Sequence, residues 1–299
     1  MRFAAALSAV QELDPLYEAG CDEVYLGLLE ESWRRTYGGH DIISRRQGKA
    51  NLAGRSELRQ VLSRAKTLRV PVYLTLNARY TPEQYPYLLK LCATFSDWGG
   101  TGVIVQDIRL LQQIKERGLP LRLTASLLMV TVNAQQVRFL KELGADRVVL
   151  PRFLRTAEMK KIASMQPEME YEVMVMGDKC PMIDGLCRSF HGETFSPVIG
   201  EKIPADAATA CLRTFDTACE AHHLCGGMQR ESDPCVACEL QGFEEAGICV
   251  MKFGGRGTPL EMRIRDLRFF ARAKSCPDPE KIQQMYREVY RHACHCYYS

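Results

Sequence analysis

Short apolar segments alternate with longer amphipathic segments along most of this chain of 299 residues. The apolar segments have the composition of buried strands, and the amphipathic segments have the residue spacing of helices. The eight predicted strands are Phe3–Leu7, Glu23–Gly27, Val70–Leu76, Gly102–Asp107, Leu121–Ser126, Arg147–Leu150, Tyr171–Met176 and Ile248–Phe253. Eight strands that alternate with helices over about 250 residues are typical of a (β/α)8, or TIM-like, barrel of the α/β class.

An open doubly wound sheet is the main alternative to this barrel. That fold typically has a glycine-rich phosphate loop after its first strand, but the sequence here continues as Leu7-Ser-Ala-Val-Gln11. Glycines instead follow the eighth strand, at Gly254–Gly257, where barrels often bind phosphate or another anion. We therefore predict the barrel.

The alternation breaks after the seventh strand. Residues 188–247 are rich in Cys, His, Pro and Gly, and we expect them to form a cysteine-rich insertion between the seventh and eighth strands. The predicted organisation is a barrel over residues 1–275 that contains this insertion. A C-terminal helix within residues 276–299 is expected to pack on the barrel.

Polar side chains stand at or just after the carboxyl ends of the predicted strands. In a barrel these ends open on one mouth, where active sites lie. The predicted substrate-binding residues are Asn77, Asp107, Ser126, Arg152, Lys252 and Arg256. Asn77 and Asp107 could instead cap the helices that follow them. Lys252 and Arg256 carry positive charge, so we expect them to bind an anionic substrate or donor.

A basic stretch, Leu28–Gly54, follows the second strand and is expected to be irregular. It could be a solvated loop, or one of its arginines could contact a substrate at the mouth. Its basic residues are Arg34, Arg35, Arg45, Arg46, Lys49 and His40.

The composition is that of a globular protein, with 46% hydrophobic and 25% charged residues. The net charge of +3 is too small to argue by itself for nucleic-acid or membrane binding. No apolar run approaches the roughly 20 residues that span a bilayer, and the N-terminus has the pattern of a first strand rather than of a signal peptide. We expect a cytoplasmic protein.

Thirteen cysteines are present, and most of them follow the seventh strand. Their odd number and the lack of an export signal argue against disulfides. Cys180 and Cys187 lie in a segment with Pro181 and Gly185 that can fold as a loop, and Cys235 begins a CxxC motif. These cysteines predict a metal centre, for which zinc and iron–sulfur are almost equally suitable. The cysteines that could complete it are Cys211, Cys219, Cys225 and Cys238.

The chain resembles the peptidase U-thirty-two, or collagenase-like, family over most of residues 1–275. The similar segments are Ala19–Gly27, Val72–Asn77, Val103–Asp107, Thr124–Ser126 with Asn133, and Leu143–Leu150. The family's cysteine signature is matched by Glu172, Gly177, Cys180, Gly185 and Cys187. A later cysteine stands seventeen positions before a lysine in the family, as Cys235 does before Lys252 (252 − 235 = 17) in the segment Lys252–Arg256.

This resemblance implies a barrel that carries a 4Fe-4S cluster held by Cys180, Cys187, Cys235 and, as the third family cysteine, Cys211. It also implies oxygen-independent hydroxylation of tRNA, ribosomal RNA or a quinone precursor in ubiquinone biosynthesis. The possible partners are thus RNA, a small aromatic or quinone substrate, and a second subunit of the same family. The alternatives are a collagenase-like peptidase and a zinc-stabilised binding module without enzymatic activity.

The sequence departs from the family pattern at several positions. Asp178 and Lys179 replace small and apolar residues of the signature. Phe153 and Gly254 stand where many members have a glutamate. Catalytic residues are therefore not assigned from the resemblance.

Overall fold

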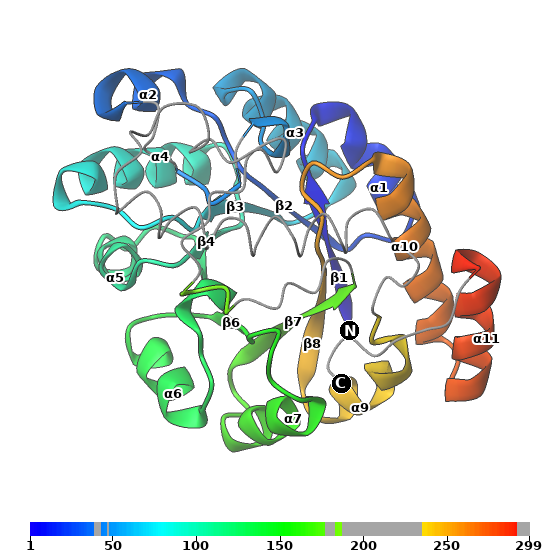
Figure 1. The fold of residues 1–299 in the computed structure, drawn as a ribbon. Helices are drawn as coiled ribbons and strands as arrows, with labels where there is room; N and C mark the ends of the chain where they lie inside the picture. The colour runs from blue at the N-terminus through cyan, green and yellow to red at the C-terminus, as the bar shows by residue number, and fades with distance from the viewer. Residues whose placement is uncertain (39–42, 47, 177–182, 187–234, 292–299) are drawn as a thin grey trace, which may run out of the picture.

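The protein folds into a closed barrel of parallel strands surrounded by helices (Figure 1). The structure, a computed structural model, describes residues 1–38, 43–46, 48–176, 183–186 and 235–291. Within these residues eight strands pair in chain order, and β1 pairs with β8 to close the barrel. The strands are β1 Arg2–Leu7, β2 Glu23–Leu26, β3 Val72–Leu76, β4 Gly102–Val105, β5 Arg122–Ala125, β6 Arg147–Val149, β7 Glu170–Met176 and β8 Ile248–Phe253. The predicted (β/α)8 barrel is confirmed.

Helices connect the strands and cover the outside of the barrel. They are α1 Leu13–Glu18, α2 Glu31–Tyr37, α3 Arg55–Leu68, α4 Tyr85–Asp97, α5 Ile108–Glu116, α6 Ala134–Glu142, α7 Thr156–Met165, α9 Leu240–Glu245, α10 Leu260–Lys274 and α11 Pro279–Tyr290. Most of them lie between successive strands, as the alternation of amphipathic and apolar segments predicted. Their apolar spacing explains the agreement, because one stripe of each helix has to be buried against the sheet.

The strands separate two sets of buried side chains, because successive residues of a strand point to opposite faces. In β3, Val72 and Leu74 belong to the large core between the sheet and the helices, with Phe95 of α4. Tyr73, which lies between them in sequence, belongs to a small separate cluster with Tyr25. The outer core supplies most of the apolar burial, at about 1.5–3 kcal/mol for each large side chain. The barrel interior is more polar and holds the charged residues described below.

Two helices were not expected from the sequence. α2 lies in the stretch Leu28–Gly54, which was predicted to be irregular. Its Trp33 is buried against the rings of Tyr37 and Tyr87, at centroid distances of 4.5 and 5.3 Å. α9 lies in the last part of the predicted insertion and buries Leu240 and Phe243. Apolar side chains at a few positions in a polar segment determine both helices, and sequence periodicity does not reveal such short patterns.

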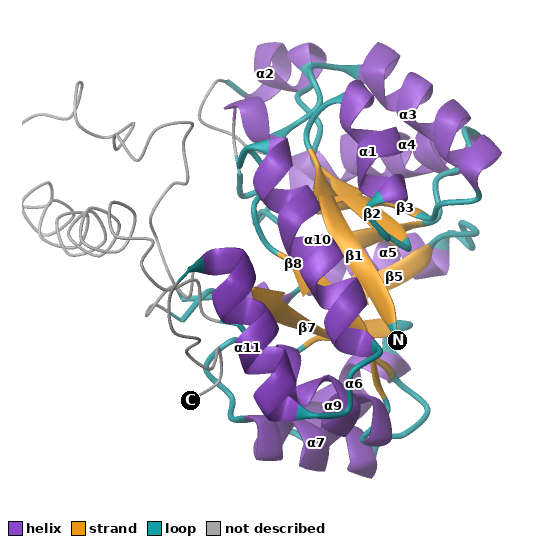
Figure 2. Cartoon of the chain, turned by 90° about the vertical axis from the view of Figure 1, so that its right-hand side faces the viewer, coloured by secondary structure: helices purple, strands orange, loops and turns teal. Residues whose placement is uncertain are grey.

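The C-terminal helix α11 packs against α10 on the outside of the barrel (Figure 2). Tyr286 and Tyr290 of α11 stack on each other at 4.4 Å, and both contact Phe269 of α10 edge-on. The Tyr290 hydroxyl donates to Asp266 Oδ1 at 2.8 Å. Among the described helices, none is long and apolar enough to cross a bilayer.

Candidate functional site: a cationic cavity at the barrel mouth

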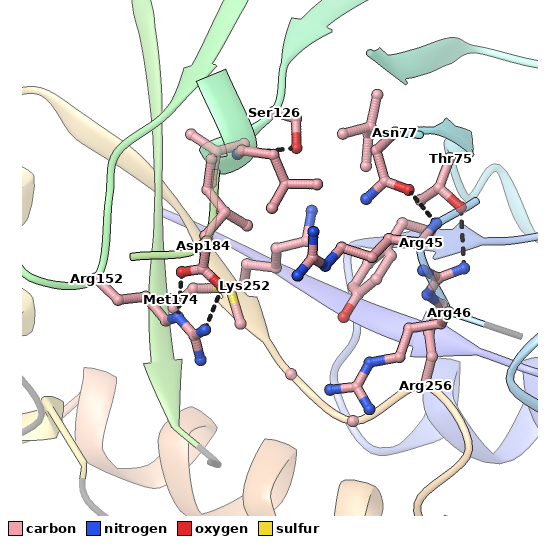
Figure 3. A pocket seen from close by; sticks show the side chains of 17 residues that line it. Arg45, Arg46, Thr75, Asn77, Ser126, Arg152, Met174, Asp184, Lys252 and Arg256 are labelled. Carbon is pink, nitrogen blue, oxygen red and sulfur yellow. Dashed lines mark hydrogen bonds and ion pairs between the residues drawn. The ribbon is translucent and has the colours of Figure 1, made fainter. Parts of the chain in front are cut away.

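A cavity of about 130 Å³ opens at the carboxyl ends of the strands (Figure 3). Tyr25 of β2, Thr75 of β3, Met174 of β7 and Lys252 of β8 contribute to its wall. Residues just beyond the strand ends complete it, among them Asn77, Ser126, Arg152 and Arg256. This is the end of a barrel at which enzymes of this architecture place their active sites. Pockets for drug-sized ligands are roughly 300–1,000 Å³, so the cavity formed by the described residues suits a small molecule.

Five of the six predicted substrate-binding residues line this cavity, namely Asn77, Ser126, Arg152, Lys252 and Arg256. The sixth, Asp107, is not part of the described lining. Its carboxylate is the N-cap of α5, where it accepts a hydrogen bond from the Leu110 backbone N–H at 2.9 Å. It also accepts from the Tyr85 hydroxyl at 3.2 Å. The structure therefore shows Asp107 as a helix cap, which was the alternative role considered from the sequence.

Arg256 is a buried cation held by neutral oxygens. Arg256 is only 7% exposed. Its Nη1 donates to Ser44 Oγ, Thr75 Oγ1 and Asn51 Oδ1, at 2.8, 3.0 and 3.2 Å. Burial lowers the pKa of Arg256 to about 10, and the nearby charge of Arg46 acts in the same direction, whereas Tyr25 opposes it. Within the described residues no carboxylate pairs with Arg256, so a bound anion would compensate its charge.

A glycine allows this placement of Arg256. A Cβ atom added to Gly27, just after β2, would lie 2.3 Å from Arg256 Nη1 and 1.8 Å from Asn51 Oδ1. Atoms cannot approach that closely, so any side chain at position 27 would displace the guanidinium or its amide partner. Gly27, the last residue of the segment Ala19–Gly27, thus has a direct structural role in the site.

Lys252 lies on the cavity wall next to the buried carboxylate of Glu172. Its Nζ donates to Glu172 Oε1 at 2.6 Å and stands 4.1 Å from the centre of the Tyr25 ring. The residue is 6% exposed. Burial lowers the pKa of Lys252, and the carboxylate of Glu172 partly opposes that effect. Figure 3 shows Lys252 between Arg152 on one side of the cavity and Arg256 on the other.

An ionic network fills the barrel interior next to Lys252. Arg147 of β6 donates to Glu172 Oε2 at 2.8 Å and to Glu23 Oε2 of β2 at 2.9 Å. It also bonds Glu170 and donates to the Tyr73 hydroxyl at 3.1 Å. Burial alone would lower the pKa of Arg147, but the carboxylates of Glu172 and Glu23 raise it above the usual arginine range. Among the described residues, every hydrogen-bond partner of Arg147 except the Tyr73 hydroxyl is a carboxylate, so this cation is compensated from within the barrel.

Arg152 holds part of the segment between Cys180 and Cys187 in the chain. Its guanidinium forms an ion pair with Asp184, in which Nε donates to Oδ2 at 2.8 Å. Arg79 Nη2 donates to the Gly185 carbonyl at 2.9 Å. Both bonds fasten residues 183–186 beside the cavity. Sequence reasoning identified Arg152 but gave no sign of its partner, because the two residues are far apart in the chain.

The basic stretch after β2 does reach the cavity. Arg45 and Arg46 both line it, and the Arg45 backbone N–H donates to Asn77 Oδ1 at 3.1 Å. The sequence left open whether these arginines were solvated or near a substrate, and the structure places them at the mouth. Arg34 and Arg35, in contrast, lie on α2 with exposed side chains. The described lining thus holds five cationic side chains, the three predicted ones (Arg152, Lys252 and Arg256) together with Arg45 and Arg46.

Of the four predicted cluster ligands, Cys180, Cys187 and Cys211 lie outside the described residues. Cys235 is described and is 3% exposed. It forms a β-bridge with Met176, the last residue of β7. The Val236 N–H also donates to the Val175 carbonyl at 3.2 Å. Cys235 thus lies at the strand end from which the chain continues toward Cys180.

The donors in the described part of the chain can be compared with what a cluster requires. No group of three or more Cys, His, Asp or Glu side chains arranged for a metal ion occurs among those residues. A 4Fe-4S cluster takes thiolate ligands, and the buried thiol of Cys235 beside the end of β7 fits one such ligand. Cys238, the other cysteine of the CxxC motif, is half-buried and has its sulfur 3.8 Å from the Pro279 carbonyl.

The fold and the cavity together define an α/β-barrel protein with a small cavity lined by several cationic side chains at the barrel mouth. The chain matches Peptidase family U32 over residues 8–295 and therefore belongs to that family. The resemblance inferred from its motifs is confirmed.

Two curated relatives are similar over part of the chain. The tRNA hydroxylation protein P of Escherichia coli is 30% identical over 91 residues, which are 30% of this chain and 20% of that protein. The tRNA hydroxylation protein P of Haemophilus influenzae is 25% identical over 126 residues, which are 42% of this chain and 27% of that protein. The matches thus cover less than a third of the length of either relative.

A solved structure supports the fold. The U32 peptidase Mk0906 superimposes with a TM-score of 0.54 at 14% identity, over 87% of this chain and 94% of that protein. At this level of identity the likeness concerns the architecture alone.

Proposed function

We propose that this protein acts in oxygen-independent hydroxylation of tRNA and that the cavity at the barrel mouth binds a small anionic substrate or donor. The observation that carries the proposal is the buried Arg256, which has only neutral partners among the described residues. The similarity to two tRNA hydroxylation proteins supports the choice of reaction. Ribosomal RNA and a quinone precursor are the alternative substrates.

The chain's own residues would bind and orient the small molecule. Arg256 would donate its remaining N–H groups to the anion, with Arg45 and Arg46 adding positive potential at the same wall. Asn77 and Ser126 would contribute neutral polar contacts, and Lys252 would face the small molecule from the cavity wall. The small volume would exclude bulk water and so strengthen these contacts.

A 4Fe-4S cluster is the proposed cofactor, held by Cys180, Cys187, Cys211 and Cys235. When bound, such a cluster would supply one-electron redox chemistry near the mouth. Cys235 supports this placement because it is buried beside the end of β7. A partner subunit of the same family is compatible with the proposal.

Anaerobic purification tests the cofactor. We expect a brown protein with iron and sulfide, and we expect Cys235→Ser to lower both. Colourless anaerobic protein with stoichiometric zinc would contradict the cluster and favour the zinc-stabilised module. A comparison of modified nucleosides and quinones in cells with and without the gene would identify the substrate.

A collagenase-like peptidase is the second hypothesis, because the family and its member Mk0906 bear that name. The described cavity does not favour it. No histidine is among the described lining residues, and Ser126 Oγ accepts a hydrogen bond from the Leu128 N–H at 3.3 Å. Cleavage of denatured collagen by metal-free protein would support the peptidase and contradict the hydroxylation proposal.

A further inference from the structure

Lys252 has an environment unlike that of the other lysines of the described chain. Its amine is buried at the cavity wall, with a carboxylate at 2.6 Å and an aromatic face at 4.1 Å. Lys90 of α4, for comparison, is fully on the exposed side of its helix. Removal of a lysine from water, or its placement near other cations, is one way in which proteins make an amine a nucleophile.

We propose that Lys252 forms a reversible imine with a small carbonyl compound that carries an acidic group, of the 2-oxo acid class. The amine selects a carbonyl, because amines add to carbonyl carbons. The arginines at 45, 46 and 256 select the acidic group, because they place positive charge in the lining of the same cavity. The volume of about 130 Å³ limits the ligand to a small molecule. Because the cavity is the substrate site of the proposed function, this assignment rests on that function.

The bond changes at Lys252 balance without an oxidant or reductant. The ammonium of Lys252 transfers one proton to Glu172, and the lone pair of the free amine forms a C–N bond at the carbonyl carbon. The carbonyl oxygen takes that proton back from Glu172 and a second proton from the nitrogen, and it leaves as water. The nitrogen lone pair then forms the C=N bond, so that the product is a protonated imine. Lys252 is the catalytic residue of this step, and Glu172 positions it and relays the proton.

A permanent ion pair between Lys252 and Glu172 is the alternative reading of the same contacts. In that case Lys252 would remain an ammonium that stabilises the barrel, and no carbonyl compound would react with it. The pair is close enough for this role, since the two atoms are 2.6 Å apart. The position of Lys252 on the cavity wall rather than in the sealed interior is what favours the chemical role.

Chemical trapping of the imine distinguishes a reactive Lys252 from a Lys252 that is permanently paired with Glu172. The protein, purified without oxygen, is incubated with pyruvate and sodium cyanoborohydride, and peptide mass spectrometry locates the reduced adduct. Each unit by which the pKa of an amine falls raises its neutral fraction about tenfold. Burial lowers the pKa of Lys252, and we therefore expect Lys252 to be labelled faster than an exposed lysine such as Lys90. Acetone, which lacks the acidic group, should label Lys252 more slowly than pyruvate does.

Two matched variants complete the experiment. Lys252→Arg keeps the positive charge but cannot form the imine, so selective labelling should disappear. Lys90→Arg should leave it unchanged. If Lys252→Arg does not fold, the site found in the wild-type protein still decides the question. Label spread evenly over exposed lysines, or no adduct at all, would overturn the imine.

This outcome is separable from that of the proposed function, because trapping requires neither tRNA nor hydroxylation. Selective labelling in a protein that hydroxylates no tRNA would retain the imine and reject the hydroxylation. The absence of a selective adduct at Lys252 in a protein that hydroxylates tRNA would reject the imine and retain the hydroxylation.

Discussion

Arg147 and Arg256 are two buried arginines of the same barrel in opposite surroundings. Arg147 lies in the interior and bonds Glu23, Glu170 and Glu172. Arg256 lies at the mouth and bonds three neutral oxygens. The carboxylates raise the pKa of Arg147, against the effect of burial, whereas burial lowers the pKa of Arg256 to about 10. A buried charge that is compensated internally holds the fold, and one that is not indicates a place for a ligand.

Removing the compensated arginine should have the largest effect on stability. Arg147→Met leaves three carboxylates inside the barrel without their common partner. Removing one member of a buried ion pair typically costs about 3–5 kcal/mol. We expect a loss of that order in the free energy of unfolding, measured by urea denaturation.

The control for Arg147 is Arg109→Met, on the surface of α5. Arg109 pairs with Glu116 at 3.9 Å, and both side chains are 53% exposed. Such surface pairs contribute about 0–1 kcal/mol, so this variant should be nearly as stable as the wild type. Equal stability of both variants would show that the interior network does not hold the barrel.

Removing the uncompensated arginine should affect binding more than stability. Arg256→Gln removes a buried charge but retains a polar side chain. Hydrogen bonds to charged groups are worth about 1.5–3 kcal/mol, so the affinity for a small carboxylate such as pyruvate should fall roughly 10- to 100-fold. Isothermal titration calorimetry measures this, with Arg109→Gln as the control. Unchanged affinity together with a large loss of stability would make Arg256 a structural residue like Arg147.

The interior network should also make stability depend on pH. Burial would raise the pKa of Glu170, but the charges of Arg147, Arg2 and Arg122 hold it below the ordinary value of 4.5. The native state therefore binds a proton less readily than the unfolded state does. The stabilisation is fully present above about pH 4.5 and is lost as the pH falls through the native pKa.

Denaturation at pH 7 and pH 4 tests this dependence. Stability should fall less between the two pH values in Glu170→Gln than in the wild type. Glu142→Gln, at an exposed position of α6, should behave as the wild type does. If Glu170→Gln retained the full pH dependence, the native pKa of Glu170 would not be lowered.

The smallest effect is expected at Asp107, which the sequence placed among the site residues. Asp107→Ala removes the N-cap of α5, and loss of such a cap costs about 1 kcal/mol. The affinity for pyruvate should not change, because Asp107 is outside the described lining. Weaker binding in a stable Asp107→Ala protein would return this residue to the site.

The sequence alone predicted the barrel architecture and several of the residues at the barrel mouth. The strand–helix alternation predicted the barrel because each strand and helix has to bury an apolar face, and that requirement is local. The carboxyl end of β8 likewise predicted Lys252 and Arg256, since barrel topology alone places those residues at the mouth.

Other features depend on contacts between distant residues. Arg147 and Glu23 are 124 positions apart, and a charge on a strand does not reveal whether it points into the barrel or which residue it meets. Asp107 had two possible roles, and only the geometry of α5 distinguishes them. Arg45 and Arg46 could not be assigned because the path of the stretch after β2 is set by α2 and its buried Trp33.

The predicted ligands Cys180, Cys187 and Cys211 lie outside the described residues and remain predictions.

Analysis of tRNA nucleosides tests most directly whether the mouth of the barrel is the working site. Cells that lack the gene would express the wild type, Arg256→Gln or Asp107→Ala at matched levels of folded protein, and hydroxylated nucleosides would be measured by mass spectrometry. We predict that the wild type and Asp107→Ala restore the modification and that Arg256→Gln does not. Full restoration by Arg256→Gln would contradict the assignment of the cationic cavity as the functional site.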